Sequence, residues 1–256
     1  MRKLKTYFAF IFSIFCFVAC KDTSLDTTIN LQSYYFPFQK LKQGQVYEYI
    51  NDSTGTIDYF WHYQSMQDDK GNWFLISAKY TPKIELEQKV TERIYKEGVT
   101  CELYEFYLKD AATESIKTTK MQLIETVTYP FEIMRDTTPN TGSVYRFKAK
   151  YTIPQEPNVN FTTNKDRKFV GLTEENINNK KTSCAIFDIQ QYTEISDTVN
   201  GGYWTMDNIQ IRDIYAEEIG LVKSIMKMKD GIPTSHTLNN RYTFQEFESK
   251  YKTTHK

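Results

Sequence analysis

Short segments in which apolar and polar residues alternate recur along this chain from residue 34 to residue 244. The clearest runs from Tyr145 to Ile153, where every second residue is apolar or aromatic and the intervening residues are Arg146, Lys148, Lys150 and Thr152. A period of two is that of a half-buried strand. About a dozen such segments, with turn residues rather than helical stretches between them, predict an all-β fold. We expect an antiparallel meander that forms a curved, incomplete barrel or a sandwich.

Turn residues separate the predicted strands, as at Asp69-Lys70-Gly71-Asn72, Glu97-Gly98 and Asp230-Gly231. One segment, residues 84–94, fits both periodicities, and we expect it to be a strand. The order of strands and turns in residues 58–99 recurs in residues 188–232. The chain therefore also fits two related β halves divided near residue 139, although meanders resemble one another in any case.

The composition supports a sheet protein and gives no electrostatic argument for nucleic acid as a partner. The chain has 19 Tyr and 17 Phe, residue types that favour strands. Without residues 1–19 it carries 29 Lys and Arg against 32 Asp and Glu. Such a mixed and nearly neutral balance does not indicate binding to polyanions or anionic lipid.

The first 20 residues predict export and lipidation. Arg2, Lys3 and Lys5 precede an apolar stretch, residues 7–19, that is too short for a membrane span, and Ala19-Cys20 follows as a lipobox. We expect cleavage before Cys20 and a thioether-linked lipid on Cys20; the alternative is an uncleaved apolar helix. The predicted organisation is a signal peptide (1–19), a polar tether (20–33), a β domain (34–244) and a charged tail (245–256).

Cys20-Lys21-Asp22 resembles the export signal of Bacteroidota-type surface lipoproteins. The resemblance implies an outer-membrane protein, anchored by its lipid and facing the cell exterior; the alternative is the periplasmic face. Four further segments resemble the acceptor sequence of the general O-glycosylation system of Bacteroidota, in which Asp precedes Ser or Thr. This resemblance implies glycan attachment at Thr27, Ser53, Thr137 and Thr198.

Two cysteines remain after the N-terminal segment, Cys101 and Cys184, and both lie in predicted strands. An oxidising compartment would permit a disulfide between them. The other alternative, which we favour, is that both are buried free thiols that behave as small apolar side chains.

No catalytic or metal-binding motif is present. His62, His236 and His255 lack ligand spacing, and we expect His236 to be a core residue. The adjacent acids Asp68-Asp69, Glu174-Glu175 and Glu217-Glu218 lie in turn-like contexts, where solvated pairs are the ordinary explanation. We therefore predict a protein without cofactor, metal or enzymatic activity. The alternative is a glycosidase-like surface hydrolase whose carboxylates come from distant strands.

The segment from Tyr215 to Lys223, Tyr-Ala-Glu-Glu-Ile-Gly-Leu-Val-Lys, resembles a strand of uncharacterised extracytoplasmic lipoproteins, some of which are thought to share the curved, incomplete barrel of lipoprotein-carrier proteins. The resemblance covers about forty residues with the following hairpin. It implies an apolar concave face for an acyl chain or another apolar ligand. We expect a binding or structural lipoprotein whose partners are the membrane, through the lipid, and an apolar ligand, a glycan or a subunit of a surface complex.

Overall fold

The computed structural model describes residues 28–109, 114–134, 143–229 and 231–251. The signal peptide, the lipidation site Cys20, the acceptors Thr27 and Thr137, His255 and the division near residue 139 fall outside these residues. No helix in the described ranges is long and apolar enough to cross a membrane.

Within the described residues, twelve antiparallel strands form a closed barrel. The all-β prediction is confirmed, whereas the incomplete barrel or sandwich is corrected to a closed ring. β7 continues into β8, and both pair with β6, so β7 adds a short extension at one edge. The ring consists of β2 (Gln45–Asn51), β3 (Ile57–Gln67), β4 (Trp73–Tyr80), β5 (Leu86–Ile94), β6 (Gly98–Lys109), β8 (Gln122–Pro130), β10 (Val144–Ile153), β11 (Glu156–Ile177), β12 (Lys180–Asp197), β13 (Tyr203–Ala216), β14 (Gly220–Met228) and β15 (Thr234–Thr243), and the extension is β7 (Ile116–Lys120).

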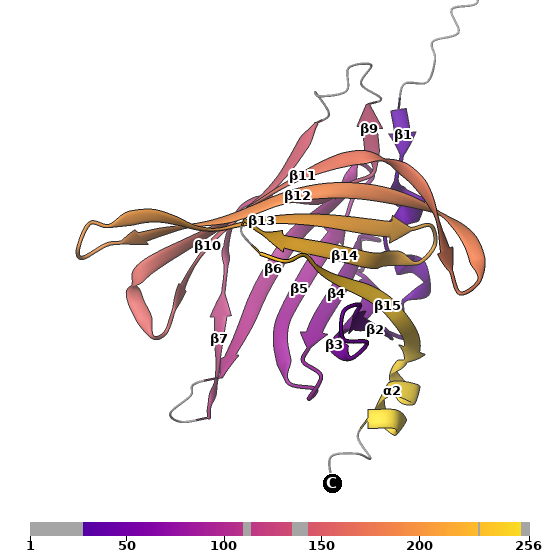
Figure 1. Cartoon of the computed structure of the whole chain (residues 1–256), viewed down its shortest axis with the longest axis horizontal. Coiled ribbons are helices and arrows are strands. Elements are labelled where there is room, and N and C mark those ends of the chain that lie inside the picture. Colours follow the sequence, from indigo (N-terminus) through magenta and orange to yellow (C-terminus); the bar gives the residue numbers. More distant parts are fainter. Residues whose placement is uncertain (1–27, 110–113, 135–142, 230, 252–256) are drawn as a thin grey trace, which may run out of the picture.

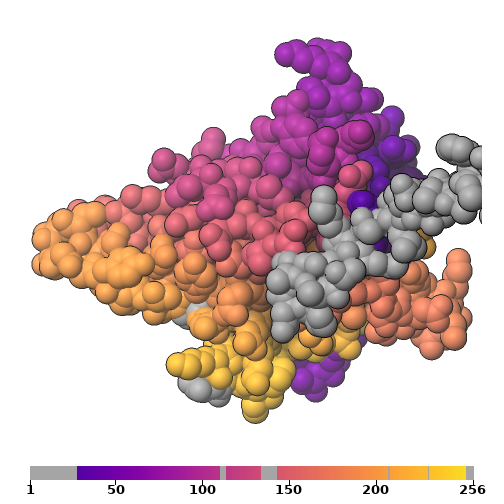
Figure 2. All heavy atoms as spheres, turned by 90° about the horizontal axis from the view of Figure 1, so that it is seen from above, coloured from indigo at the N-terminus to yellow at the C-terminus, as the bar shows by residue number. Residues whose placement is uncertain are grey.

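The barrel closes between strands that lie far apart in the sequence. All other neighbours in the ring follow one another closely along the chain, but β15 pairs with β2 from His236–Asn51 to Thr243–Gln45. We call this pairing the closing seam. β11, β12 and β13, with 22, 18 and 14 residues, are the longest strands of the ring, so the barrel is uneven. In Figure 1, β11–β14 cross in front of β4–β6. The orange β12–β13 hairpin lies far from the indigo N-terminal segment (Figure 2).

The N-terminal segment closes one end of the barrel. β1 (Thr28–Asn30) pairs with β9 (Glu132–Met134), and the single-turn helices η2 (Gln32–Tyr34) and η3 (Phe38–Lys40) follow. The backbone is fixed to that end by bonds from Leu31 N to Phe131 O, 2.6 Å, and from Glu218 N to Ser33 O, 2.8 Å. We call residues 28–41 the plug. The predicted tether, 20–33, is therefore too long, because the folded part begins at Thr28.

Aromatic rings hold the plug in the barrel. Phe36 is 6% exposed, and its ring centroid lies 4.1 Å from Tyr63 and 6.3 Å from Tyr215. Gly220, at φ +99°, lies directly against this ring, since a Cβ there would be 2.7 Å from Phe36 Cε1. The inward face of β3 supplies Tyr63 to this core.

The predicted charged tail contains a helix that packs on the outside of the barrel. α2 (Phe244–Tyr251) buries Phe247 against Phe60 and Val46 of β3 and β2. The sequence indicated only a charged tail here, because the segment is mainly polar. The apolar residues that bind it lie on the outer face of distant strands, so local sequence gave no signal for docking.

Beneath α2, the carboxylate of Glu48 is buried at the closing seam, with 1% of its surface exposed. Burial by itself would raise the pKa of Glu48, but hydrogen bonds outweigh that effect and lower it. The donors come from β15 and α2: Tyr251 Oη at 2.6 Å, Asn239 Nδ2 at 2.6 Å, Tyr242 Oη at 2.9 Å and Asn240 Nδ2 at 3.0 Å. One carboxylate therefore joins β2, β15 and the helix.

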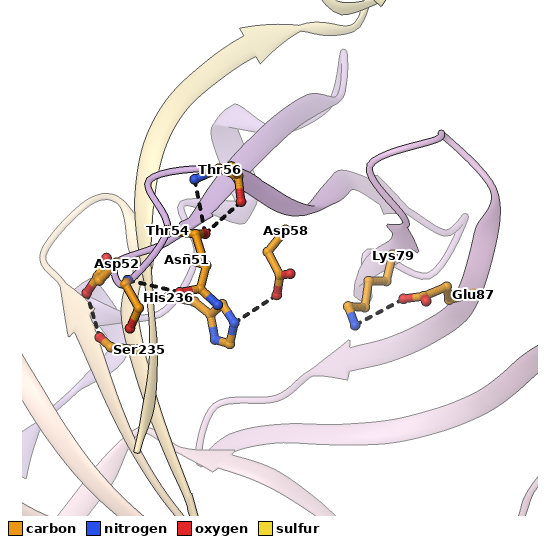
Figure 3. A network of polar contacts seen from close by, with 10 residues as sticks. Asn51, Asp52, Thr54, Thr56, Asp58, Lys79, Glu87, Ser235 and His236 are labelled. Atoms are coloured by element: carbon orange, nitrogen blue, oxygen red, sulfur yellow. Dashed lines mark hydrogen bonds and ion pairs between the residues drawn. The ribbon is translucent and has the colours of Figure 1, made fainter. Parts of the chain in front are cut away.

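Three further polar contacts cross between the β2–β3 region and β15, and Figure 3 shows those of Ser235 with Asp52 and of His236 with Asp58. Asp52 accepts hydrogen bonds from Ser235 Oγ at 2.6 Å and Thr237 Oγ1 at 3.0 Å. His236 Nε2 lies 2.8 Å from Asp58 Oδ2, and the imidazole is buried, as expected for a core histidine. The closing seam is thus held by side chains as well as by the backbone ladder.

Candidate functional site

The barrel interior contains a cavity of about 200 Å³ between the plug and the strands. Seven aromatic side chains contribute to its walls, including Phe36 from the plug. The polar residues that line it are fewer and come from separate strands: Ser77, Gln88, Glu92, Thr128, Lys165 and Arg167. A mainly apolar cavity with a small number of polar groups is the usual composition of a small-molecule site.

Lys165 and Arg167 reach the cavity because they lie on the inward face of β11. Strand pleating places Phe161, Thr163, Lys165, Arg167 and Phe169 on one side. Asp166, on the other side, pairs with Arg146 on the outside of the barrel at 2.6 Å. The guanidinium of Arg167 lies 5.6 to 5.8 Å from the ring centroids of Phe187, Tyr215 and Tyr129, a range in which cation–π attraction operates.

Two carboxylates lie near these cations, the half-buried Glu92 and the buried Asp213, and each has a neutral hydrogen-bond donor. Tyr35 Oη of the plug donates to Glu92 Oε2 at 2.6 Å. Ser224 Oγ donates to Asp213 Oδ1 at 2.7 Å, while Asp213 Oδ2 lies 3.8 Å from Arg167 Nη2. The hydrogen bond from Tyr35 to Glu92 therefore joins the plug to the cavity wall. Asp213, which does not line the cavity itself, orients the guanidinium of Arg167.

Burial shifts the pKa values of these groups toward their neutral forms. It raises the pKa of Glu92 against the hydrogen bonds of Thr128 and Tyr35, and it raises the pKa of Asp213 against the charge of Arg167. Burial also lowers the pKa of Lys165, and the nearby charge of Arg167 adds to that shift. For Arg167, burial is outweighed by Tyr215 and Asp213, so its pKa is raised and it stays charged. The interior is consequently a low-dielectric site with a persistent positive group.

Further polar groups lie between the cavity and the β2–β3 turn. Lys79 Nζ is 4.9 Å from the centroid of Tyr59. It also lies 3.1 Å from Glu87 Oε2, an ion pair that Figure 3 shows. The ring of His236 lies 5.3 Å from the same Tyr59. Although paired with Glu87, Lys79 is close enough to the cavity that its charge adds to the lowering of the Lys165 pKa by burial and by Arg167.

The two described glycosylation candidates lie in exposed turns. Ser53 is in the β2–β3 turn, next to Asp52, whose carboxylate is engaged by β15. Thr198, in the β12–β13 turn, donates its hydroxyl to Asn158 O at 2.8 Å. Their modification stays a prediction.

Cys101 and Cys184 are free, buried thiols that belong to two different apolar clusters, so the alternative of a disulfide is not realised. Burial raises the pKa of Cys101 to about 12 and that of Cys184 to about 11. Both thiols are therefore protonated and act as small apolar side chains.

The adjacent acids singled out in the sequence do not line the cavity. Glu174 and Glu218 form exposed ion pairs with Lys181 and Lys40, and Asp68 accepts hydrogen bonds within its own turn. In the described ranges, no cluster of His, Cys, Asp and Glu could hold a metal ion.

Sequence reasoning missed Glu92, Lys165, Arg167 and Asp213. A signal was present in β11, because Lys165 and Arg167 share their parity with Phe161 and Phe169, which marks them as inward-facing. Glu92 likewise shares its parity with Val90 and Ile94. What the pattern could not give is that these strands face one another across a cavity.

The solved structures that are similar to the chain include three of bacterial origin. A protein provisionally described as a lipoprotein, from Parabacteroides distasonis ATCC 8503, has 11% identity and a TM-score of 0.45, covering 80% of this chain and 95% of its own. One provisionally described as an exported protein with a YmcC-like fold, from Bacteroides fragilis NCTC 9343, has 13% identity and a TM-score of 0.46, with coverages of 81% and 98%. The hypothetical lipoprotein YmcC of Escherichia coli (K12) has 12% identity and a TM-score of 0.29, with coverages of 94% and 97%.

No protein-family model and no curated protein matches the sequence. At the identities and TM-scores of the three structures, similarity does not assign a function.

Proposed function

We propose that this protein is a lipid-anchored extracytoplasmic lipoprotein whose barrel binds a small, largely apolar ligand in its interior. The observation that carries the proposal is the cavity of about 200 Å³ with aromatic walls. An apolar protein cavity of about 150 Å³ is large enough to bind benzene. A ligand the size of one ring or a short acyl chain therefore matches the space.

The anchor follows from the N-terminal sequence, and the plug sets its geometry. From Cys20 to Thr28 the chain spans at most about 27 Å, at roughly 3.4 Å per residue. The plugged end would therefore face the membrane, and the opposite end, with the β2–β3 and β12–β13 turns, would point away from it. Lys21-Asp22 favours the outer membrane and the cell surface, with the periplasmic face as the alternative.

Replacing Cys20 by alanine should abolish anchoring, because no other residue of the lipobox can carry a thioether. In fractionated cells of a host that processes lipoproteins, we expect Cys20→Ala to leave the detergent-soluble membrane fraction. Cys16→Ala, which removes the other N-terminal cysteine, should stay membrane-bound. Retention of the unlipidated Cys20→Ala protein with the membrane would show that the lipobox prediction is wrong.

Filling the cavity should abolish binding of a small apolar probe. Ser77 lines the cavity and is buried, so Ser77→Phe places a ring in the ligand space. We expect toluene, followed by ligand-observed NMR, to bind the wild type and to lose at least about tenfold in affinity in this variant. Gln64→Phe adds the same ring at an exposed position of β3 and should bind as the wild type does.

Equal toluene binding by the two phenylalanine variants, or none by the wild type, would contradict an interior ligand site and favour an architectural lipoprotein. A surface hydrolase would instead need two carboxylates across a cleft. Among the described residues that line the cavity, Glu92 is the single carboxylate, so the proposal includes no catalytic step.

A further inference from the structure

Lys165 and Arg167 present unused hydrogen-bond donors to the cavity. Among the described residues, Lys165 has no ion-pair partner within 4.0 Å. The guanidinium of Arg167 interacts with the Tyr215 hydroxyl, and its ion pair with Asp213 is long, at 3.8 Å. Even a half-buried cation normally has its donors satisfied, because an uncompensated charge in a site poor in water is costly. The ammonium group of Lys165 and the remaining donors of Arg167 are therefore available to a group in the cavity.

The surroundings fix the orientation of Arg167 without using up its donors. Three aromatic rings, those of Tyr129, Phe187 and Tyr215, surround the guanidinium, and Asp213 lies on one side. A planar guanidinium held in this way can bind a carboxylate through two parallel hydrogen bonds. Lys165, two residues earlier on the same face, adds a second charge at one strand repeat, roughly 7 Å along the backbone.

The neighbouring carboxylates neutralise the positive charge of Lys165 and Arg167 only in part. Glu92 is bound by Tyr35 and Asp213 by Ser224, and burial favours the protonated form of each acid. Burial likewise disfavours the charge of Lys165, a cost that an anionic partner would remove.

We propose that the cavity binds a small organic carboxylate, with its carboxylate between Lys165 and Arg167 and its aromatic or short aliphatic body against the aromatic walls. The inference rests on the proposed interior ligand site and names its ligand class. The space of about 200 Å³ limits the body to about one ring.

The test compares benzoate with benzamide, which has the same shape and no charge, by ligand-observed NMR at neutral pH and fixed ionic strength. We expect benzoate to bind the wild type at least about tenfold more tightly, since hydrogen bonds to charged groups are stronger than neutral ones. Lys165→Met should weaken benzoate about fivefold or more and leave benzamide within about twofold, because only the anion uses the ammonium group. The variant should fold, because it removes a buried charge and preserves the length of the side chain.

Two further variants sharpen the result. Lys168→Met removes a lysine from the outer face of the same strand and should change neither affinity. Arg167→Lys keeps the charge but loses the planar fork, so it should weaken benzoate specifically.

Equal affinity for benzoate and benzamide in the wild type, or an unchanged preference in Lys165→Met, would overturn the carboxylate site while leaving the interior ligand site in place. Failure of both compounds to bind, together with toluene binding that Ser77→Phe does not affect, would instead refute the interior site itself and this inference with it.

Discussion

Glu48→Gln should lower the free energy of unfolding by about 3 kcal/mol at pH 7, as measured by denaturant titration. The carboxylate of Glu48 is the common acceptor for Asn239, Asn240, Tyr242 and Tyr251, all beneath or within α2. Glutamine has nearly the same volume but turns one acceptor atom into a donor. The neutral amide replaces charge-assisted hydrogen bonds with weaker ones, and its nitrogen cannot accept from the Tyr242 and Tyr251 hydroxyls that Glu48 Oε2 binds, so those two bonds must reverse or break. The closing seam and the helix are therefore weakened together.

A matched control is Glu174→Gln, which removes an exposed carboxylate 3.6 Å from Lys181. Because exposed ion pairs contribute little, this variant should lie within about 0.5 kcal/mol of the wild type. If Glu48→Gln is equally mild, the buried carboxylate does not stabilise the seam.

The stabilisation by Glu48 should also depend on pH. The pKa of Glu48 is lower in the folded protein than its ordinary value of about 4.3. The ionised carboxylate therefore stabilises the fold at all pH values above that ordinary value, and its contribution is lost as the pH falls through the lowered pKa. The difference between wild type and Glu48→Gln should shrink below about pH 4 in the same titration.

Gly220→Ala should destabilise the protein by about 2 to 4 kcal/mol, because two costs add. At φ +99° any Cβ is strained, and here it would also lie 2.7 Å from Phe36 Cε1, so the ring that anchors the plug must move. Phe36→Ala alone should cost about 3 to 5 kcal/mol, the usual range for a buried aromatic side chain. Denaturant midpoints of both variants provide the measurement.

The double variant separates the two costs. With Phe36 reduced to alanine the steric contact disappears, so Gly220→Ala should then cost about 1 kcal/mol, the strain of the backbone alone. If Gly220→Ala lowers the free energy of unfolding by the same amount in both backgrounds, the Phe36 ring does not restrict the residue at position 220.

Much of the fold could be predicted from local pattern. The period of two from Tyr145 to Ile153 and the turn at Asp69-Lys70-Gly71-Asn72 correspond to β10 and to the β3–β4 hairpin. Of residues 84–94, which also fitted a helix, 86–94 form β5, so the strand prediction is confirmed from Leu86 onward. Closure was not predictable in this way, because it depends on β15 pairing with β2 across most of the chain.

The candidate site was harder to predict than the fold. The alternation in β11 shows that Lys165 and Arg167 point inward. The sequence does not show which residues of other strands they would face, because these are brought near only when the barrel closes. Glu92 comes from β5 and Tyr35 from the plug, and only the closed barrel brings them to 2.6 Å. The plug itself was mistaken in part for a tether, because Leu31 follows a polar stretch and its burial comes entirely from the barrel.

The sequence by itself determined an all-β chain, the inward and outward faces of its strands, and the predicted lipid attachment at Cys20, because each depends on residues next to one another. Only the tertiary structure decided that the sheet closes, that residues 28–41 fill one end, and that two cations and an aromatic lining share a cavity. Those features depend on contacts between distant segments, whose register is set by how the whole barrel packs rather than by any local period.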